Sequence, residues 1–220
     1  MKLSVSELLI MFENTNFANY NSFMEETIEK EKLQLEQSYE DYIMKYPKEV
    51  HDRIFEDQFE DDFHNFRDVF PKILRTSALI AQYAYFEKTL NKISNDCQEK
   101  FNLTIKPKDI RHNGVKKYIF YLKHVVGLRI NDGESLWRKI EVYNQLRNHF
   151  VHSPEDEFSL KEKLKLEQNV KGLKFKKDAL DPEIFDLIRI EKEMNEDFFE
   201  LYTEALKYII SELKIKNQEL

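Results

Sequence analysis

The chain has 220 residues, with 34 Lys and Arg against 41 Asp and Glu, a formal net charge of −7 and 41% hydrophobic residues. This apolar content excludes a disordered acidic polymer, and the acidic balance argues against nonspecific coating of DNA, because affinity for phosphate polymers grows with positive charge. With only 4 Gly and 5 Pro, the composition favours long helices, and we expect one domain over residues 1–220.

The cysteine content and the hydrophobic runs indicate the cellular setting. The single cysteine, Cys97, cannot form an intrachain disulfide and has no Cys or His neighbour at metal-ligand spacing. The apolar run at residues 8–12 is too short to span a membrane or to serve as a secretion signal. We therefore expect a soluble cytoplasmic protein that needs no metal or cofactor and no membrane.

The N-terminal part of the sequence predicts three helices. Ser22 and Glu25 fit a capping box, so the first helix is expected at residues 22–46, before Pro47. Residues 51–70 carry seven acidic side chains against two Arg, together with an aromatic stripe at helical spacing, which predicts a core-facing helix with a solvated acidic face: Phe55, Phe59, Phe63, Phe66 and Phe70. Pro71 breaks or restarts this helix, and residues 72–95 form an apolar core helix.

The remaining elements follow from turn residues and alternation. Residues 105–124 have a local charge of +5. A helix is predicted at 115–127, and residues 131–133 (Asn-Asp-Gly) are typical of a turn before the next helix, at 134–152. Alternating residues predict a hairpin within 160–178, and Asp181-Pro182 predicts the start of a final helix at 182–213. The expected fold is an all-α bundle with a small β-hairpin inserted after the helix at 134–152.

The helix at 134–152 contains a charged residue at an unusual position. A helical wheel places Arg147 within the apolar arc formed by residues such as Leu146 and Phe150, where an unpaired guanidinium is very costly. Glu87 occupies the equivalent position on the helix at 72–95, so we infer a Glu87–Arg147 ion pair.

Two further polar residues adjoin Arg147. Asn148 and His152 are four residues apart and therefore share a helical face, and Ser153 before Pro154 ends the helix. The helix C-terminus favours the protonated imidazole of His152. Such a cluster suits binding of a phosphate and transfer of a proton; the alternative is a structural Arg–Glu brace with a solvent-exposed His.

The segment Arg147-Asn148-x-x-x-His152 resembles the Arg-x(4–6)-His signature of HEPN (higher eukaryotes and prokaryotes nucleotide-binding) domains. Tyr83-x-x-x-Glu87, in the upstream helix, is similar to the acidic helix position of many members. The resemblance covers the core at residues 71–152. Some members carry a modifiable Tyr two residues after the motif His, where this chain has Pro154.

The resemblance implies a metal-independent endoribonuclease that acts as a homodimer, with two motif helices forming one cleft. His152 would be the general base or acid for attack by the RNA 2′-hydroxyl, Arg147 would stabilise the charged phosphate, and Asn148 would orient it. Glu87, Tyr83 and His149 would be supporting residues, although His149 points away from Arg147 on the wheel. A role as a toxin or antiphage effector would involve an antitoxin or sensor protein as a partner.

RNA binding would require a positively charged surface. Residues 161–177 have a local charge of +5, and with residues 105–124 they supply the predicted RNA-binding lysines Lys116, Lys117, Lys174, Lys176 and Lys177. The alternative is a solvated lysine-rich strand edge. Two other functions remain open: a catalytically silent HEPN-like protein that binds a nucleotide or a protein partner, and a plain helical dimerisation module.

Overall fold

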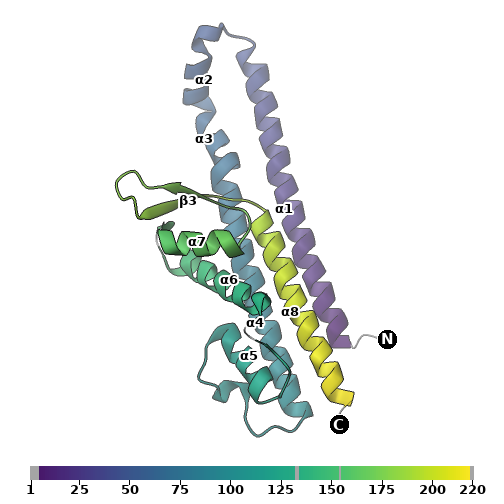
Figure 1. Cartoon of the computed structure of the whole chain (residues 1–220). Coiled ribbons are helices and arrows are strands. Elements are labelled where there is room, and N and C mark those ends of the chain that lie inside the picture. Colours follow the sequence, from purple (N-terminus) through teal and green to yellow (C-terminus); the bar gives the residue numbers. More distant parts are fainter. Residues whose placement is uncertain (1–4, 132–133, 154, 219–220) are drawn as a thin grey trace.

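Four long helices form the frame of the molecule in the computed structural model, which describes residues 5–131, 134–153 and 155–218 (Figure 1). They are α1 (Val5–Ile43), α4 (Phe70–Lys100), α6 (Ser135–His152) and α8 (Glu193–Gln218). The shorter helices are α2 (His51–Gln58), α3 (Glu60–His64), α5 (Gly114–His124) and α7 (Leu160–Asn169), with 3-10 turns at Lys48–Val50 and Pro107–Asp109. Within the described ranges, no helix combines the length and apolarity that crossing a bilayer requires.

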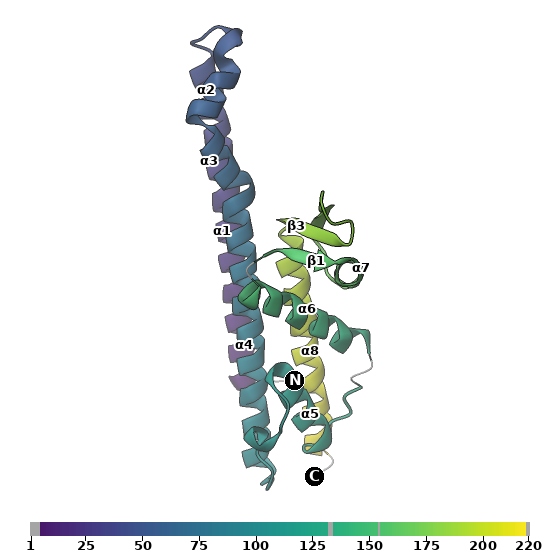
Figure 2. The same cartoon turned by 90° about the vertical axis from the view of Figure 1, so that its left-hand side faces the viewer.

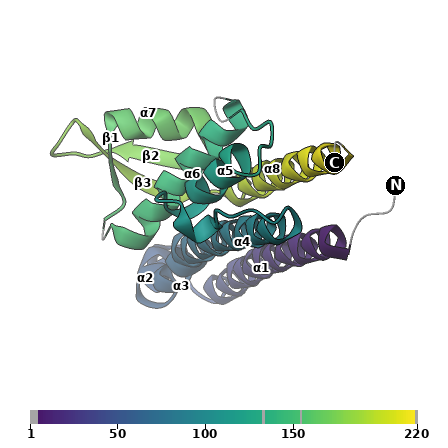
Figure 3. The same ribbon diagram turned by 90° about the horizontal axis from the view of Figure 1, so that it is seen from below.

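Helices α1 and α8 lie along α4, and α6 crosses both α4 and α8. Seen from below, α1 lies on one side of α4 and α8, whereas α5, α6, α7 and the strands lie on the other (Figure 3). Large aromatic side chains fill the centre of this arrangement and are almost fully inaccessible: Phe86, Tyr121, Tyr143, Phe198 and Tyr202. This core fixes the position of α6.

A two-helix arm projects beyond the rest of the molecule (Figures 1 and 2). We define the arm as residues 27–69: the C-terminal half of α1, then α2, α3 and a π-helical turn at Asn65–Val69. The predicted aromatic stripe lies here and packs against α1, with the rings of Phe55, Phe59 and Phe63 each 5.2–5.8 Å from Tyr39. No residue of the arm is fully buried, so the expectation that this stripe faces the core is wrong.

The arm joins α4 without a break in the helical path. Pro71 follows the π-helical turn and occupies the first turn of α4, where its missing N–H is tolerated. In an uninterrupted α-helix, the ring of Pro71 would clash with the carbonyl of Arg67, and the wider turn lies at that position. Helix α1 also continues through Ser22, whose hydroxyl bonds to Glu26 at 3.1 Å, so the capping box predicted at Ser22 is wrong.

A three-stranded antiparallel sheet follows α6, with strand order β1-β3-β2. Its strands are β1 (Glu157–Ser159), β2 (Leu173–Lys177) and β3 (Ile184–Ile190), and a register shift interrupts the β2–β3 pairing between Lys174 and Phe175. A small β element after the motif helix is thus confirmed within a mostly helical fold, but the hairpin predicted within residues 160–178 is wrong. Helix α7 occupies 160–169, because Ser159 and Glu162 form a true capping box.

The predicted final helix at 182–213 begins too early. Residues 184–190 are rich in β-branched side chains and form β3, and α8 begins only at Glu193. Asp178 and Asp181 instead accept backbone N–H bonds from the turn between β2 and β3. Three predicted helices are confirmed to within a few residues, those at 72–95, 115–127 and 134–152, although α4 extends five residues further at its C-terminus. The turn predicted at 131–133 lies largely outside the described residues.

Candidate functional site

Helix α6 carries the motif residues and is held in place by its apolar face. Trp137, Ile140 and Leu146 are buried on this face, where α6 contacts α4 and α8. The buried hydroxyl of Tyr143 donates to Asp197 of α8 at 2.8 Å, and Asp197 pairs with a lysine, Lys171, at 2.8 Å. These contacts fix the rotation of α6 and therefore the direction in which its polar residues point.

Arg147 and Asn148 are joined directly at the C-terminal end of α6. The Arg147 Nη1 donates to the Asn148 Oδ1 at 2.9 Å, and both side chains are half-buried. The Arg147 Nε is buried and has no hydrogen-bond partner in the described part of the chain. An arginine with an unused buried donor is a site at which an anionic group could gain hydrogen bonds.

The predicted Glu87–Arg147 ion pair is not formed. The half-buried Glu87 instead faces the start of α5, where its Oε2 lies 3.8 Å from the position that a Cβ on Gly114 would occupy. Gly114 has a φ of +58°, a conformation that favours glycine. The sequence correctly placed Glu87 and Arg147 on neighbouring helices, but the wheel could not show that α5 lies beside Glu87.

The buried side chain of Tyr83 interacts electrostatically with both Glu87 and Arg147. Its ring is 2% exposed and stacks on Phe198 with centroids 5.6 Å apart. Burial raises the pKa of Tyr83 well above its ordinary value, the charge of Glu87 raises it further, and Arg147 acts in the opposite direction. Tyr83 is therefore a neutral phenol in the field of both residues.

The two histidines at the end of α6 lie in different environments. His152 is exposed at the last position of the helix. His149 is half-buried and stacks on Phe158 of β1 with ring centroids 4.0 Å apart, while its Nε2 is buried without a partner among the described residues. His149 thus faces the sheet, and Pro154 lies outside the described residues.

The predicted RNA-binding lysines lie on either side of α6. Lys116 of α5 forms an ion pair with Glu141 of α6 at 2.7 Å, and the Lys117 Nζ lies 5.6 Å from the ring centroid of Tyr118. On the other side, Lys174, Lys176 and Lys177 are exposed on the edge strand β2. Figures 1 and 2 both show α5 below α6 and the sheet above it, so the two basic segments flank the motif helix in space.

A groove of about 300 Å³ lies between α4, α5 and α6, and Tyr83 and Lys116 are the predicted site residues that line it. Its lining includes Tyr83, Asn144 and a cluster of three rings. In this cluster the ring centroid of Phe120 lies 4.9 Å from that of His112 and 4.5 Å from that of His124. The signal for Asn144 was present, because it precedes Asn148 by four residues and therefore lies on the same helical face.

Other chemistries find little support among the described residues. No group of three or more His, Cys, Asp or Glu in these residues could hold a metal ion. Cys97 is buried, and burial raises the pKa of its thiol to about 11, so little reactive thiolate forms at neutral pH. No protein-family model, no curated protein and no solved structure matches this chain. Its function must therefore be inferred from the residues themselves.

Proposed function

We propose that this chain is a metal-independent endoribonuclease of the HEPN type. The observation that supports the proposal most directly is the cluster at the end of α6: Arg147 bonded to Asn148, with a buried unpartnered Nε, and an exposed His152 one helical turn after Asn148. The motif resemblance gives this cluster its chemical interpretation. The core of the proposed HEPN-like domain, residues 71–152, comprises α4, α5 and α6.

The reaction that we propose is an intramolecular transfer of the phosphoryl group from the 5′-oxygen to the 2′-oxygen of the RNA backbone. His152 takes the proton of the 2′-hydroxyl, the 2′-oxygen attacks the adjacent phosphorus, and the bond to the 5′-oxygen breaks. The products are a 2′,3′-cyclic phosphate and a 5′-hydroxyl, which receives a proton from a protonated imidazole or water. Arg147 donates to the nonbridging oxygens as negative charge accumulates, and Asn148 holds the guanidinium in position.

A homodimer in which two motif ends meet is part of the proposal. Val151 of α6 is 43% exposed and Ile73 of α4 is 58% exposed. An ion pair between Lys72 and Asp156 holds the segment after α6 beside the start of α4, next to Ile73. Light scattering should then give about twice the chain mass of 26.6 kDa, and a strict monomer would contradict the shared cleft.

Cleavage of total RNA in the presence of EDTA tests the activity. Arg147→Ala should reduce the rate by roughly 10²–10³-fold and His152→Ala by roughly 10²–10⁴-fold. A matched control is His64→Ala, which removes an exposed imidazole from the arm and should leave the rate unchanged. Circular dichroism establishes that each variant is folded; equal rates in all four proteins would refute the site.

The basic strand β2 is tested by the salt dependence of RNA binding. The triple variant Lys174→Ala, Lys176→Ala, Lys177→Ala should lower the slope of log K against log salt by up to about 2, since each phosphate contact to a single strand contributes roughly 0.7. The control triple, with the same charge change on the arm side, is Lys30→Ala, Lys45→Ala, Lys48→Ala. An unchanged slope in the β2 triple would exclude this strand as a contact surface.

A second candidate is a silent HEPN-like protein that binds a nucleotide. The groove between α4, α5 and α6 favours it, because Phe120 and its two flanking histidines offer rings on which a base can stack. Nucleotide binding that Phe120→Ala abolishes, without any RNA cleavage by the wild type, would favour this function over the nuclease. Whether the chain is a nuclease or a nucleotide-binding protein, a role as an effector would involve a sensor or antitoxin protein as its partner.

A further inference from the structure

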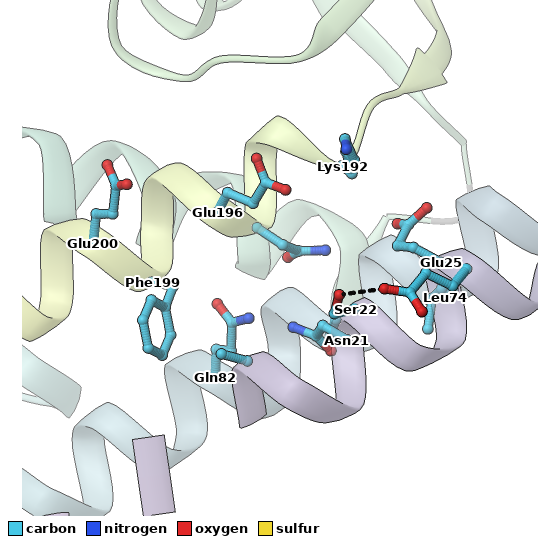
Figure 4. Close-up of a pocket in the computed structure, with 13 residues that line it drawn as sticks. Asn21, Ser22, Glu25, Leu74, Gln82, Lys192, Glu196, Phe199 and Glu200 are labelled. Carbon is cyan, nitrogen blue, oxygen red and sulfur yellow. Dashed lines mark hydrogen bonds between the residues drawn. The ribbon is translucent and has the colours of Figure 1, made fainter. Parts of the chain in front are cut away.

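A second groove, of about 400 Å³, lies between α1, α4 and α8, outside the motif cluster (Figure 4). Its floor is partly apolar, formed by residues such as Leu74, Ala78 and Phe199. Its size is within the usual range for small-molecule sites. None of the motif residues Arg147, Asn148 and His152 lines it.

Two buried amide oxygens in the lining of this groove have no hydrogen-bond partner in the described part of the chain. Gln82 is 1% exposed and its Oε1 is unpaired; Asn195 is 6% exposed and its Oδ1 is unpaired. The Asn195 Nδ2 donates to the backbone oxygen of Arg75 at 3.0 Å, which fixes the orientation of this amide. Figure 4 shows the Gln82 amide pointing from α4 into the space between α1 and α8. Both groups require a donor, because an unpaired buried acceptor is unfavourable.

The mouth of the groove is negatively charged. Glu26 of α1 and Glu196 and Glu200 of α8 are exposed there, and none of the three forms an ion pair within the described ranges; Lys192 is the lining residue of opposite charge. Glu25 also lines the groove, but Arg75 binds both of its oxygens, at 2.8 and 2.7 Å. A ligand for this groove should therefore be cationic and rich in N–H donors.

The same features distinguish an organic cation from a metal ion. In the described ranges, no three acidic, His or Cys side chains come close enough together to hold a metal, and the partly apolar floor offers contacts that suit methylene groups. We propose that this groove binds an aliphatic polyamine. Its ammonium groups donate to the Gln82 Oε1 and the Asn195 Oδ1 and neutralise Glu196 and Glu200, while its methylene chain lies over Phe199.

Calorimetry with spermidine and the full chain, freed of RNA, tests the site. The wild type should bind, and Gln82→Leu should bind at least roughly tenfold more weakly, because one charge-assisted hydrogen bond is lost. The Leu side chain removes an unpaired buried acceptor, so the melting temperature of the ligand-free variant should stay the same or rise. Equal spermidine affinity in Gln82→Leu and the wild type, or no binding by the wild type, would overturn the proposal.

The carboxylates and the ligand chemistry are tested separately. Glu196→Gln with Glu200→Gln should weaken spermidine binding at least roughly tenfold, whereas Glu56→Gln with Glu60→Gln, the same charge change on the exposed arm, should not. Magnesium at matched ionic strength and tetramethylammonium, which has no N–H donor, should not replace spermidine. Equal losses in both double variants, or equal binding of all three cations, would indicate a nonspecific effect of charge and overturn the site.

Discussion

The arm and the body of the molecule both carry aromatic residues at helical spacing, yet only the body has a core. Phe59 in the arm is half-buried against Tyr39 and Tyr42, whereas Phe198 in α8 is fully inaccessible and packs against Tyr83, Tyr143 and Tyr202. A stripe on two paired helices leaves one side open to water. A stripe becomes a core only where other elements cover that side, as α6 and α8 do for α4.

The largest expected difference comes from deleting one ring in each region. Phe198→Ala should lower the free energy of unfolding by about 3–5 kcal/mol, since the body cannot close around the cavity. Phe59→Ala should cost about 1 kcal/mol, because its ring is partly hydrated already. Urea denaturation measures both values, and equal losses would show that the arm is as tightly packed as the body.

A smaller difference is expected when one hydroxyl is removed. Tyr143→Phe should cost about 1–2 kcal/mol, because buried Asp197 loses a hydrogen bond, whereas Tyr46→Phe on the exposed arm should stay within about 0.5 kcal/mol.

The pH dependence gives a second measure of the Tyr143 hydroxyl. Burial and Asp197 raise the pKa of Tyr143, so its contribution is complete below the unfolded-state value of about 10 and is lost as the pH rises above it. Denaturation at pH 8 and pH 11 should show a smaller loss of stability in Tyr143→Phe than in the wild type. The same pH dependence in both proteins would contradict the burial of this hydroxyl beside Asp197.

The smallest expected contrast concerns two serines. Ser159→Ala should cost about 1 kcal/mol because it removes the cap of α7, whereas Ser22→Ala, in the middle of α1, should change stability by less than about 0.5 kcal/mol. Hydrogen bonds from Ser159 lower the pKa of Glu162. The stability that these bonds contribute is therefore present at pH values above the ordinary pKa of about 4.3 and is lost as the pH falls. A pH series of denaturation midpoints measures it, and a larger loss for Ser22→Ala would mean that α1 begins at Ser22 in solution.

The sequence predicted helices best where a polar–apolar period runs between clear stops. Helix α6 fits this description, and its predicted range of 134–152 agrees with the structure to one residue. Elsewhere, two local sequence patterns predicted different secondary structures for the same segment. Leu164 and Leu166 alternate as in a strand, but the Ser159–Glu162 capping box prevails and residues 160–169 are helical. Asp181-Pro182 is a typical helix start, yet the β-branched run after it pairs with β2, a contact that a local pattern cannot reveal.

The candidate site was predictable only in part. The position of Arg147 within the apolar arc predicted a buried guanidinium, and in the structure this side chain is only half-buried. Its bond to the adjacent Asn148, and the orientation of Glu87 toward Gly114, depend on side-chain rotamers and on where α5 packs. The groove between α1, α4 and α8 lay beyond sequence reasoning, because Gln82 and Asn195 are more than 100 residues apart.

The π-helical turn at Asn65–Val69 has a geometric consequence for the arm. A turn with one extra residue changes the phase of all side chains beyond it by about 100°, the rotation per residue of an α-helix. The aromatic side chains of α3 and the apolar face of α4 are thus two separately phased surfaces, although α3, this turn and α4 follow one another without a gap. Removing a single residue from this turn would rotate α2 and α3 relative to α4, whereas inserting residues at 44–47, at the far end of the arm, would leave the orientation of the arm toward the body unchanged.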